Sequence, residues 1–273
     1  MNHIRLAACF VAVLTTVCVA EVSSFAQTVT GPQTVPGQIV PLNPQNVTPK
    51  TLPVFKDGQA QIVKGFSSSR EWIRHDLFVE TDFDSDGNGL MDRMHVSVCR
   101  PKQTDTEGLK VPVIYGTSPY YNGTSPAGRE YVWDPKQEVG GEPPKRKIPE
   151  GFKARIKRPN ISTAYVRQWV KRGFAVVHSS SPGTGLSQGC PTVGAENESL
   201  APKAVIDWLC GRRKGYTELN SNIEVKATWC TGKVGMTGTS YNGTLPIAAA
   251  TTGVEGLEAV SYTHLTLPTT PYV

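Results

Sequence analysis

Alternation of apolar and polar residues marks the start of the folded region. Glu71 to Glu80 and Asp92 to Cys99 alternate in this way, as half-buried strands do, and a short acidic turn joins them. Val111 to Tyr115 and Phe174 to His178 are instead apolar runs, apart from the terminal His178, as expected for strands buried on both faces. The pattern therefore predicts an antiparallel hairpin followed by central strands of a larger sheet.

Helical periodicity appears between the later strands. It predicts a helix from Ser162 to Arg172, which Gly173 ends, and a second helix from Glu196 to about Gly211. The second helix has a stripe of core residues, namely Ala204, Val205, Trp208 and Leu209. Leu257 to Val260 then has the composition of a further sheet strand.

The stretch 235–244 predicts the end of a strand, a sharp turn and the start of a helix. Ser240 lies at the turn between Gly238 and Gly243, in a G-x-S-x-x-G pattern one residue longer than the G-x-S-x-G nucleophile elbow of α/β-hydrolases. Glycines allow strand and helix to approach closely while the hydroxyl projects alone. The backbone amide of Tyr241 then points to where a tetrahedral oxyanion forms. The motif by itself also fits an ordinary turn with an exposed serine.

The order of these elements predicts the fold class. Strand, strand, strand, helix, strand, helix, strand, elbow, helix, strand is the first half of an α/β-hydrolase, with crossovers long enough for parallel pairing. We expect a mixed, mostly parallel sheet that is incomplete after the strand following the elbow. The chain has 273 residues and 38% hydrophobic content, enough for one substantial core.

Tyr120 is a second candidate for the oxyanion site. It follows the buried strand 111–115, and in a hydrolase sheet the loop at this point supplies the second oxyanion donor. Here the tyrosine hydroxyl would donate in place of a backbone amide. A surface aromatic residue in a Pro-Tyr turn is the alternative.

The acidic turn between the first two strands places oxygen-bearing side chains at every second residue. Asp84, Asp86, Asn88 and Asp92 follow the pattern D-x-D-x-N-G-x-x-D, which resembles calcium-binding loops. The bidentate glutamate at the twelfth loop position is missing. A hairpin turn built from ordinary turn-forming residues is therefore the alternative to a calcium site.

The N-terminal residues have the features of a secretory signal. Arg5 gives a positive start, and the apolar run Leu6 to Ala20 is too short to span a bilayer. We expect cleavage after Ala26 and a secreted or periplasmic mature protein without membrane contact. The remaining segments are a Pro/Thr-rich leader (27–53), a partial catalytic domain (54–260) and a Thr/Pro-rich tail that we expect to be non-native (261–273).

Charge and cysteine content restrict the possible partners. The net charge is +5, and its positive excess crowds into an insertion, residues 124–160, that is rich in proline and poor in stacking aromatic residues. A solvated loop fits this composition better than a nucleic-acid site. Gly183-x-Gly185 lacks the other residues of a nucleotide-binding loop, so we expect no cofactor.

Four cysteines remain after signal cleavage, namely Cys99, Cys190, Cys210 and Cys230. Their long spacings disfavour a zinc site. The sequence allows two alternatives. Cys210 forms a disulfide with Cys230 or Cys190, or all four thiols stay unpaired.

Several separated motifs resemble one known family. The elbow Gly-Thr-Ser-Tyr-Asn-Gly-Thr with the following residues 248–257, together with Phe78 to Gly87, Ser118 to Tyr121 and Gly173 to Val177, is similar to the Xaa-Pro dipeptidyl-peptidases. These are serine hydrolases related to the cocaine esterase-like acyl hydrolases. The resemblance covers roughly residues 55–260, and several motifs in order are more specific than one.

The resemblance implies a serine exopeptidase that releases an N-terminal Xaa-Pro dipeptide. Ser240 would be the nucleophile, and the Tyr241 amide and Tyr120 hydroxyl would be the oxyanion donors. The implied partner is a peptide with proline at its second position, and a full-length protein could form a homo-oligomer. An acid and a histidine are implied later in the chain.

The sequence departs from this pattern after the nucleophile. No aspartate follows Ser240, and Glu255, Glu258 and His264 are the only carboxylates and histidine there. His75, His95 and His178 precede the nucleophile and lie on predicted strands. We therefore expect this chain to be an inactive N-terminal part of a longer enzyme. A cocaine esterase-like ester or amide hydrolase and a non-catalytic secreted calcium-binding domain are the alternatives.

Overall fold

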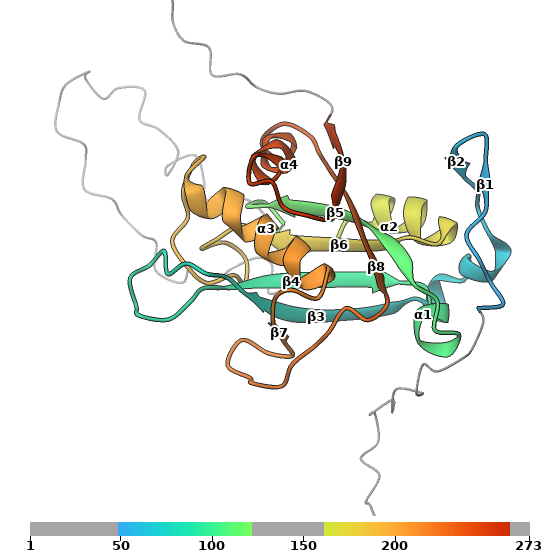
Figure 1. Cartoon of the computed structure of the whole chain (residues 1–273), viewed down its shortest axis with the longest axis horizontal. Coiled ribbons are helices and arrows are strands. Elements are labelled where there is room, and N and C mark those ends of the chain that lie inside the picture. The colour runs from blue at the N-terminus through green and yellow to red at the C-terminus, as the bar shows by residue number, and fades with distance from the viewer. Residues whose placement is uncertain (1–48, 122–160, 263–273) are drawn as a thin grey trace, which may run out of the picture. The chain divides into compact units, whose positions relative to one another are not determined.

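A seven-stranded sheet organises the described part of the chain, which in this computed structural model is residues 49–121 and 161–262 (Figure 1). Its strands are β3 (Ile73–Glu80), β4 (Arg93–Arg100), β5 (Val111–Ser118), β6 (Ala175–Ser180), β7 (Gly215–Tyr216), β8 (Cys230–Gly238) and β9 (Leu257–Tyr262). A separate ribbon pairs β1 (Phe55–Lys56) with β2 (Gln59–Ala60). The α-helices are α1 (Gln103–Thr106), α2 (Thr163–Trp169), α3 (Glu196–Leu209) and α4 (Tyr241–Thr251), and the short 3₁₀ helices are η1 (Lys64–Phe66), η2 (Ser69–Glu71) and η4 (Val170–Arg172).

Some predicted segments lie outside the described residues. These are the signal peptide (1–26), the leader up to residue 48, the basic insertion (124–160) and the tail from residue 263, which includes His264.

The sheet is mixed, with the strand order β7-β3-β4-β6-β5-β8-β9. β3 and β4 form the predicted antiparallel hairpin, in register from Ile73 opposite Arg100 to Glu80 opposite Arg93. β4 joins β6 antiparallel, whereas β6, β5, β8 and β9 are parallel neighbours. Parallel neighbours need crossover connections, and α2, α3 and α4 lie in those connections. The predicted first part of an α/β-hydrolase fold is confirmed.

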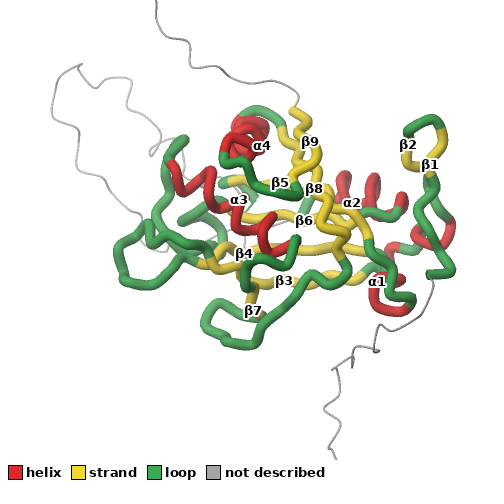
Figure 2. The backbone as a smooth tube through the Cα atoms, in the orientation of Figure 1, coloured by secondary structure: helices red, strands yellow, loops and turns green. Residues whose placement is uncertain are grey.

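Two apolar clusters lie on opposite faces of the sheet because side chains alternate along each strand. On β4, Val96 and Val98 belong to the larger cluster with residues of α3 and α4, whereas Cys99 belongs to a smaller cluster with residues of α2. α3 and α4 lie side by side on the first face (Figure 2). α2 covers the other face.

The predicted core stripe of the second long helix is confirmed. All four predicted residues of α3 are buried, namely Ala204, Val205, Trp208 and Leu209, and so are others that include Ala201 and Ile206. The indole N–H of Trp208 donates to the carbonyl of Val225 at 2.7 Å, and its ring packs edge-on against Trp229. No helix among residues 49–121 and 161–262 is long and apolar enough to cross a membrane.

The structure adds one strand that the sequence did not predict and lengthens another. β7 pairs with β3 through Tyr216 opposite Phe78, and two residues are too few for periodicity to reveal. β9 continues through Ser261 and Tyr262, which pair with Thr237 and Gly238 of β8, so the strand runs two residues beyond its predicted end.

The four described cysteines are unpaired thiols, and the disulfide that the sequence left open is not formed. Cys99 and Cys230 are buried, and burial raises the pKa of each thiol to about 11. Both thiols therefore stay protonated at neutral pH.

A row of polar residues crosses the α2 face of the sheet. Asp76, Ser97 and His178 lie opposite one another on β3, β4 and β6, and the Ser97 hydroxyl donates to Asp76. The Nδ1 atom of His178 accepts the backbone N–H of Ser162 at 3.2 Å, and its ring stacks on Tyr121 with 4.7 Å between centroids. Burial lowers the pKa of His178 to about 4, so the imidazole is neutral in the folded chain at neutral pH.

Leu77→Ala tests the larger core. Leu77 has no exposed surface, so we expect the free energy of unfolding to fall by about 2–5 kcal/mol. Urea unfolding measures the change. The matched control is Leu52→Ala, because Leu52 is 55% exposed and its truncation should change stability by less than about 0.5 kcal/mol. Equal losses in both variants would contradict the assigned core.

The buried imidazole predicts a pH dependence. The unfolded chain takes up a proton at His178 below its ordinary pKa of 6.5, whereas the folded chain does so only near pH 4. The contribution of His178 to the free energy of unfolding is therefore fully present above pH 6.5. It decreases as the pH drops towards 4, by up to about 1.4 kcal/mol per pH unit. We expect His178→Asn to reduce this slope in urea unfolding across a pH series. An unchanged slope would show that His178 is not held neutral.

Candidate active site

Ser240 occupies the sharp turn between the end of β8 and the start of α4. Its backbone angles are φ 57° and ψ −129°, outside the regions that side-chain-bearing residues favour. Asp57 is the one other non-glycine residue with positive φ in the described ranges. Such a conformation costs about 1–3 kcal/mol and persists only where the surrounding structure imposes it. The serine itself is exposed, so its hydroxyl is accessible.

The two flanking glycines explain how so tight a turn is possible. A Cβ atom on Gly238 would lie 1.9 Å from the carbonyl oxygen of Asn242, and one on Gly243 would lie 3.2 Å from the oxygen of Gly238. The first distance is impossible without backbone movement, and the second is tight. The close approach of strand and helix predicted from the G-x-S-x-x-G pattern is therefore present.

The N-terminus of α4 is directed at the turn. The carbonyl of Ser240 accepts the N–H groups of Gly243 at 2.7 Å and Thr244 at 3.2 Å, so these are the first helical hydrogen bonds. The N–H groups of Tyr241 and Asn242 precede them and have no backbone acceptor among the described residues. They lie at the positive end of the helix dipole, next to the serine. A negatively charged oxygen at this position is favoured electrostatically.

Tyr120 lies at the same end of the sheet as the elbow. It follows β5, and its backbone N–H donates to the Ser118 hydroxyl at 3.0 Å. Its side chain is 49% exposed, and its ring centroid is 6.2 Å from that of Tyr241. The fold therefore brings together the two tyrosines that the sequence singled out.

The side chain of Tyr241 has a role that the sequence did not suggest. Its hydroxyl donates to the buried carboxylate of Glu198 on α3 and accepts the N–H of Gly194 at 3.2 Å. Burial, followed by the hydrogen bond to Glu198, raises the pKa of Tyr241 to about 12. Glu198 and Tyr241 are far apart in the sequence, and no local motif links them. This contact fixes the first residue of α4 against α3.

None of the histidines in the described residues hydrogen-bonds to Ser240. His75, His95 and His178 lie on β3, β4 and β6, as predicted. Burial lowers the pKa of His75, like that of His178, to about 4. The Nε2 atom of His95 lies 3.6 Å from Asp76.

The carboxylates around the elbow are engaged elsewhere or exposed. Glu255 lies 3.9 Å from Arg212, and Glu258 is exposed on β9. Asp207 forms ion pairs with Lys203 and Arg212. Burial opposes ionisation of Asp207, but the hydrogen bonds from these two residues hold its pKa below the ordinary value.

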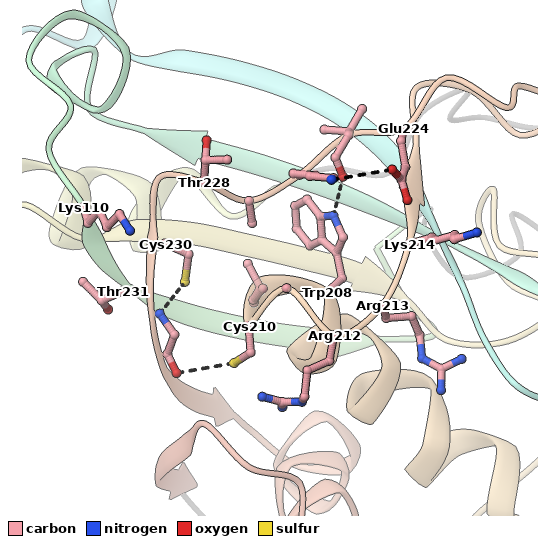
Figure 3. A pocket seen from close by; sticks show the side chains of 16 residues that line it. Lys110, Trp208, Cys210, Arg212, Arg213, Lys214, Glu224, Thr228, Cys230 and Thr231 are labelled. Atoms are coloured by element: carbon pink, nitrogen blue, oxygen red, sulfur yellow. Dashed lines mark hydrogen bonds and ion pairs between the residues drawn. The ribbon is translucent and has the colours of Figure 1, made fainter. Parts of the chain in front are cut away.

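Two cavities lie at opposite ends of β8. A cavity of about 120 Å³ lies beneath the elbow and is lined by residues that include Gly238, Asn242 and His178. A larger one, about 540 Å³, lies at the start of β8 (Figure 3). The charged residues of its lining are mainly basic, namely Lys110, Arg212, Arg213, Lys214 and Lys226 with a single carboxylate, Glu224. β8 rises about 3.3 Å per residue, so the larger cavity is well separated from Ser240.

The calcium candidates gather in the turn between β3 and β4. One carboxylate oxygen from each of Asp84, Asp86 and Asp92 lies within 4.8 Å of the others. The side-chain oxygen of Asn88 instead accepts the N–H of Leu90 at 2.8 Å. Three of the four candidates therefore converge.

Comparison with known proteins identifies relatives. Residues 86–266 match the family described as X-Pro dipeptidyl-peptidase (S15 family). A Rhodopirellula baltica protein, provisionally named a Xaa-Pro dipeptidyl-peptidase, is 63% identical over 209 residues, which are 77% of this chain and 33% of the relative. The Xaa-Pro dipeptidyl-peptidase of Pediococcus pentosaceus is 35% identical over 232 residues, covering 77% of this chain and 28% of the relative. The chain thus spans about a third of the length of these relatives.

Solved structures give weaker matches. An α-amino acid ester hydrolase has 18% sequence identity and a TM-score of 0.41, over 77% of this chain and 28% of that protein. A CocE/NonD family hydrolase from Staphylococcus aureus has 16% identity and a TM-score of 0.39, over 73% and 31%. The family match covers more than half of the sequence and includes the elbow. This chain therefore belongs to the X-Pro dipeptidyl-peptidase (S15) family.

Proposed function

We propose that this chain carries the nucleophile of a serine exopeptidase that releases Xaa-Pro dipeptides from the N-terminus of peptides. The observation that carries the proposal is the strained backbone of Ser240, held between β8 and α4 in a chain of the S15 family. A strained backbone at this turn is typical of a nucleophile elbow, where it exposes the serine hydroxyl to the substrate.

The chemistry begins with attack of the Ser240 hydroxyl oxygen on the carbonyl carbon of the proline residue. The hydroxyl proton passes to a base, and the carbonyl oxygen becomes an oxyanion. The oxyanion collapses, the bond to the leaving amine breaks, and the amine takes up a proton. Water then attacks the acyl-enzyme, so that the dipeptide leaves and the serine hydroxyl is restored.

The Tyr241 amide and the Tyr120 hydroxyl are the proposed oxyanion donors. The Tyr241 N–H is the first amide of α4 and lies next to Ser240. Tyr120 comes from the loop after β5, and the proposal is supported by the 6.2 Å between its ring centroid and that of Tyr241. Fixed donors of this kind stabilise charge that develops only in the transition state.

In this proposal the base and its supporting acid lie outside the 273 residues of this chain. No described histidine hydrogen-bonds to Ser240, and without a nearby imidazole a serine is a weak nucleophile at neutral pH. We therefore assign the activity to a protein of the length of the relatives, and we expect the 273-residue chain alone to be inactive. Export, directed by residues 1–26, belongs to the same proposal, and N-terminal sequencing of the mature protein would test it.

Ser240→Ala, made in a protein of the length of the relatives, tests whether Ser240 is the nucleophile. We expect kcat/KM for a chromogenic Xaa-Pro substrate to fall by about 10⁶-fold, because the acyl-enzyme cannot form. Ser68→Ala is the matched control, since Ser68 is exposed and distant in sequence from the elbow. Loss of activity in both variants, or in neither, would contradict the assignment. Hydrolysis of simple esters without Xaa-Pro cleavage would instead assign the protein to the cocaine esterase-like hydrolases.

Tyr120→Phe tests the second oxyanion donor. Removing the hydroxyl should lower kcat by about 10²–10³-fold with little change in KM, because the hydrogen bond strengthens in the transition state. Tyr216→Phe is the control: its ring packs beneath Arg93 on the β7 side of the sheet, and the contact survives loss of the hydroxyl. An unchanged kcat in Tyr120→Phe would exclude the hydroxyl as a donor.

A further inference from the structure

Three carboxylates converge in the turn between β3 and β4, and none of them pairs with a described basic residue. Asp84, Asp86 and Asp92 converge there, with one oxygen of each within 4.8 Å of the others. The two nearby arginines are engaged elsewhere, because Arg93 binds Glu80 and Arg213 binds Asp82. Within the described ranges, no lysine or arginine forms an ion pair with the three converging carboxylates.

Asp92 shows that the charge is not simply exposed to water. Its side chain is buried, with 1% of the residue exposed. The Oδ2 atom accepts the N–H of Ser85 at 2.9 Å and its hydroxyl at 2.6 Å, whereas the buried Oδ1 atom has no hydrogen-bond partner in the described structure. A buried carboxylate oxygen without a partner is costly, so a cation is the natural counterpart.

Backbone hydrogen bonds fix the position of the Asp84 carboxylate. Its carboxylate accepts N–H groups from Gly87 at 2.8 Å, Asn88 at 3.1 Å and Gly89 at 2.7 Å. Oδ1 accepts two of these N–H groups and Oδ2 accepts one, so Oδ2 retains a lone pair for a further ligand.

We propose that Asp84, Asp86 and Asp92 bind a calcium ion. Oxygen-only donors favour hard cations, and calcium binds oxygen at about 2.3–2.6 Å in flexible geometry. Two oxygens on one calcium ion are therefore at most about 5 Å apart, which the 4.8 Å limit of the cluster meets without rearrangement. Magnesium requires shorter bonds and near-ideal octahedral geometry. The remaining positions go to water or backbone carbonyls.

The ion would also stabilise the loop between β6 and α3, whose Gly194 N–H donates to the Tyr241 hydroxyl at 3.2 Å. The Ser85 hydroxyl, which donates to Asp92, accepts the N–H of Cys190 at 2.9 Å. The Cys190 carbonyl in turn accepts the side-chain N–H of Asn197 at 3.0 Å, at the start of α3. Asn197 precedes Glu198, which holds the Tyr241 hydroxyl. The proposed calcium site does not depend on the proposed peptidase activity. Bound calcium would nevertheless order the loop that contacts Tyr241 at the start of α4.

Calorimetric titration of the chelator-treated 273-residue chain with calcium chloride tests the site. We expect one ion per chain, with a Kd of about 10⁻⁴–10⁻³ M, and an increase in Tm that magnesium chloride does not reproduce. Asp86→Asn should weaken binding at least tenfold. It should leave the calcium-free Tm unchanged, because Asp86 is exposed. Asp92→Asn should abolish binding.

Asp82→Asn is the matched control. Asp82 lies in the same turn but pairs with Arg213, so its replacement should leave calcium affinity unchanged. No binding by the unchanged chain at millimolar calcium would overturn the proposal. So would equal responses to magnesium and calcium, or binding that survives in Asp86→Asn with unchanged affinity.

Hydrogen exchange tests the effect on the loop. We expect calcium to slow exchange of the backbone amides between Gly183 and Ala195, that of Cys190 above all, in the unchanged chain but not in Asp86→Asn. Unchanged exchange with calcium bound would contradict the proposed ordering of this loop.

Discussion

The structure around Ser240 depends on the close approach of β8 and α4. A Cβ atom at Gly238 would lie 1.9 Å from the backbone of Asn242, so only glycine permits this turn. The turn forces Ser240 into a conformation that a serine adopts only under constraint. The constraint comes from burial on both sides of the turn, because Val234 and Met236 of β8 and Leu245 and Ala249 of α4 are buried. The energy that packs this layer therefore also holds the strained serine.

A second constraint acts at the start of α4. The Tyr241 hydroxyl bridges Glu198 of α3 and the N–H of Gly194, so the helix that carries the proposed oxyanion amide is tied to its neighbour by a part-buried polar contact. The same tyrosine ring lies beside Tyr120 from the loop after β5. Three segments of the chain thus meet at the elbow, each positioned by a different part of the sheet.

Local sequence patterns predicted most of the fold because the elements carry their own periodicity. The β3–β4 hairpin, the buried stripe of α3 and the glycines of the elbow are all visible in stretches of about ten residues. The contacts that remained hidden join distant residues. Glu198 with Tyr241, and Asp92 with Ser85 and Cys190, depend on tertiary packing that no local pattern encodes. The two-residue strand β7 is too short to show any period.

The central proposal is that Ser240 is a nucleophile whose base is missing from the 273-residue chain. Labelling with a fluorophosphonate probe, with the modified peptide mapped by mass spectrometry, tests both parts at once. The account predicts that a protein of the length of the relatives is labelled at Ser240 and that the 273-residue chain is not. Labelling of the 273-residue chain at Ser240, or labelling of the longer protein at another residue, would contradict it.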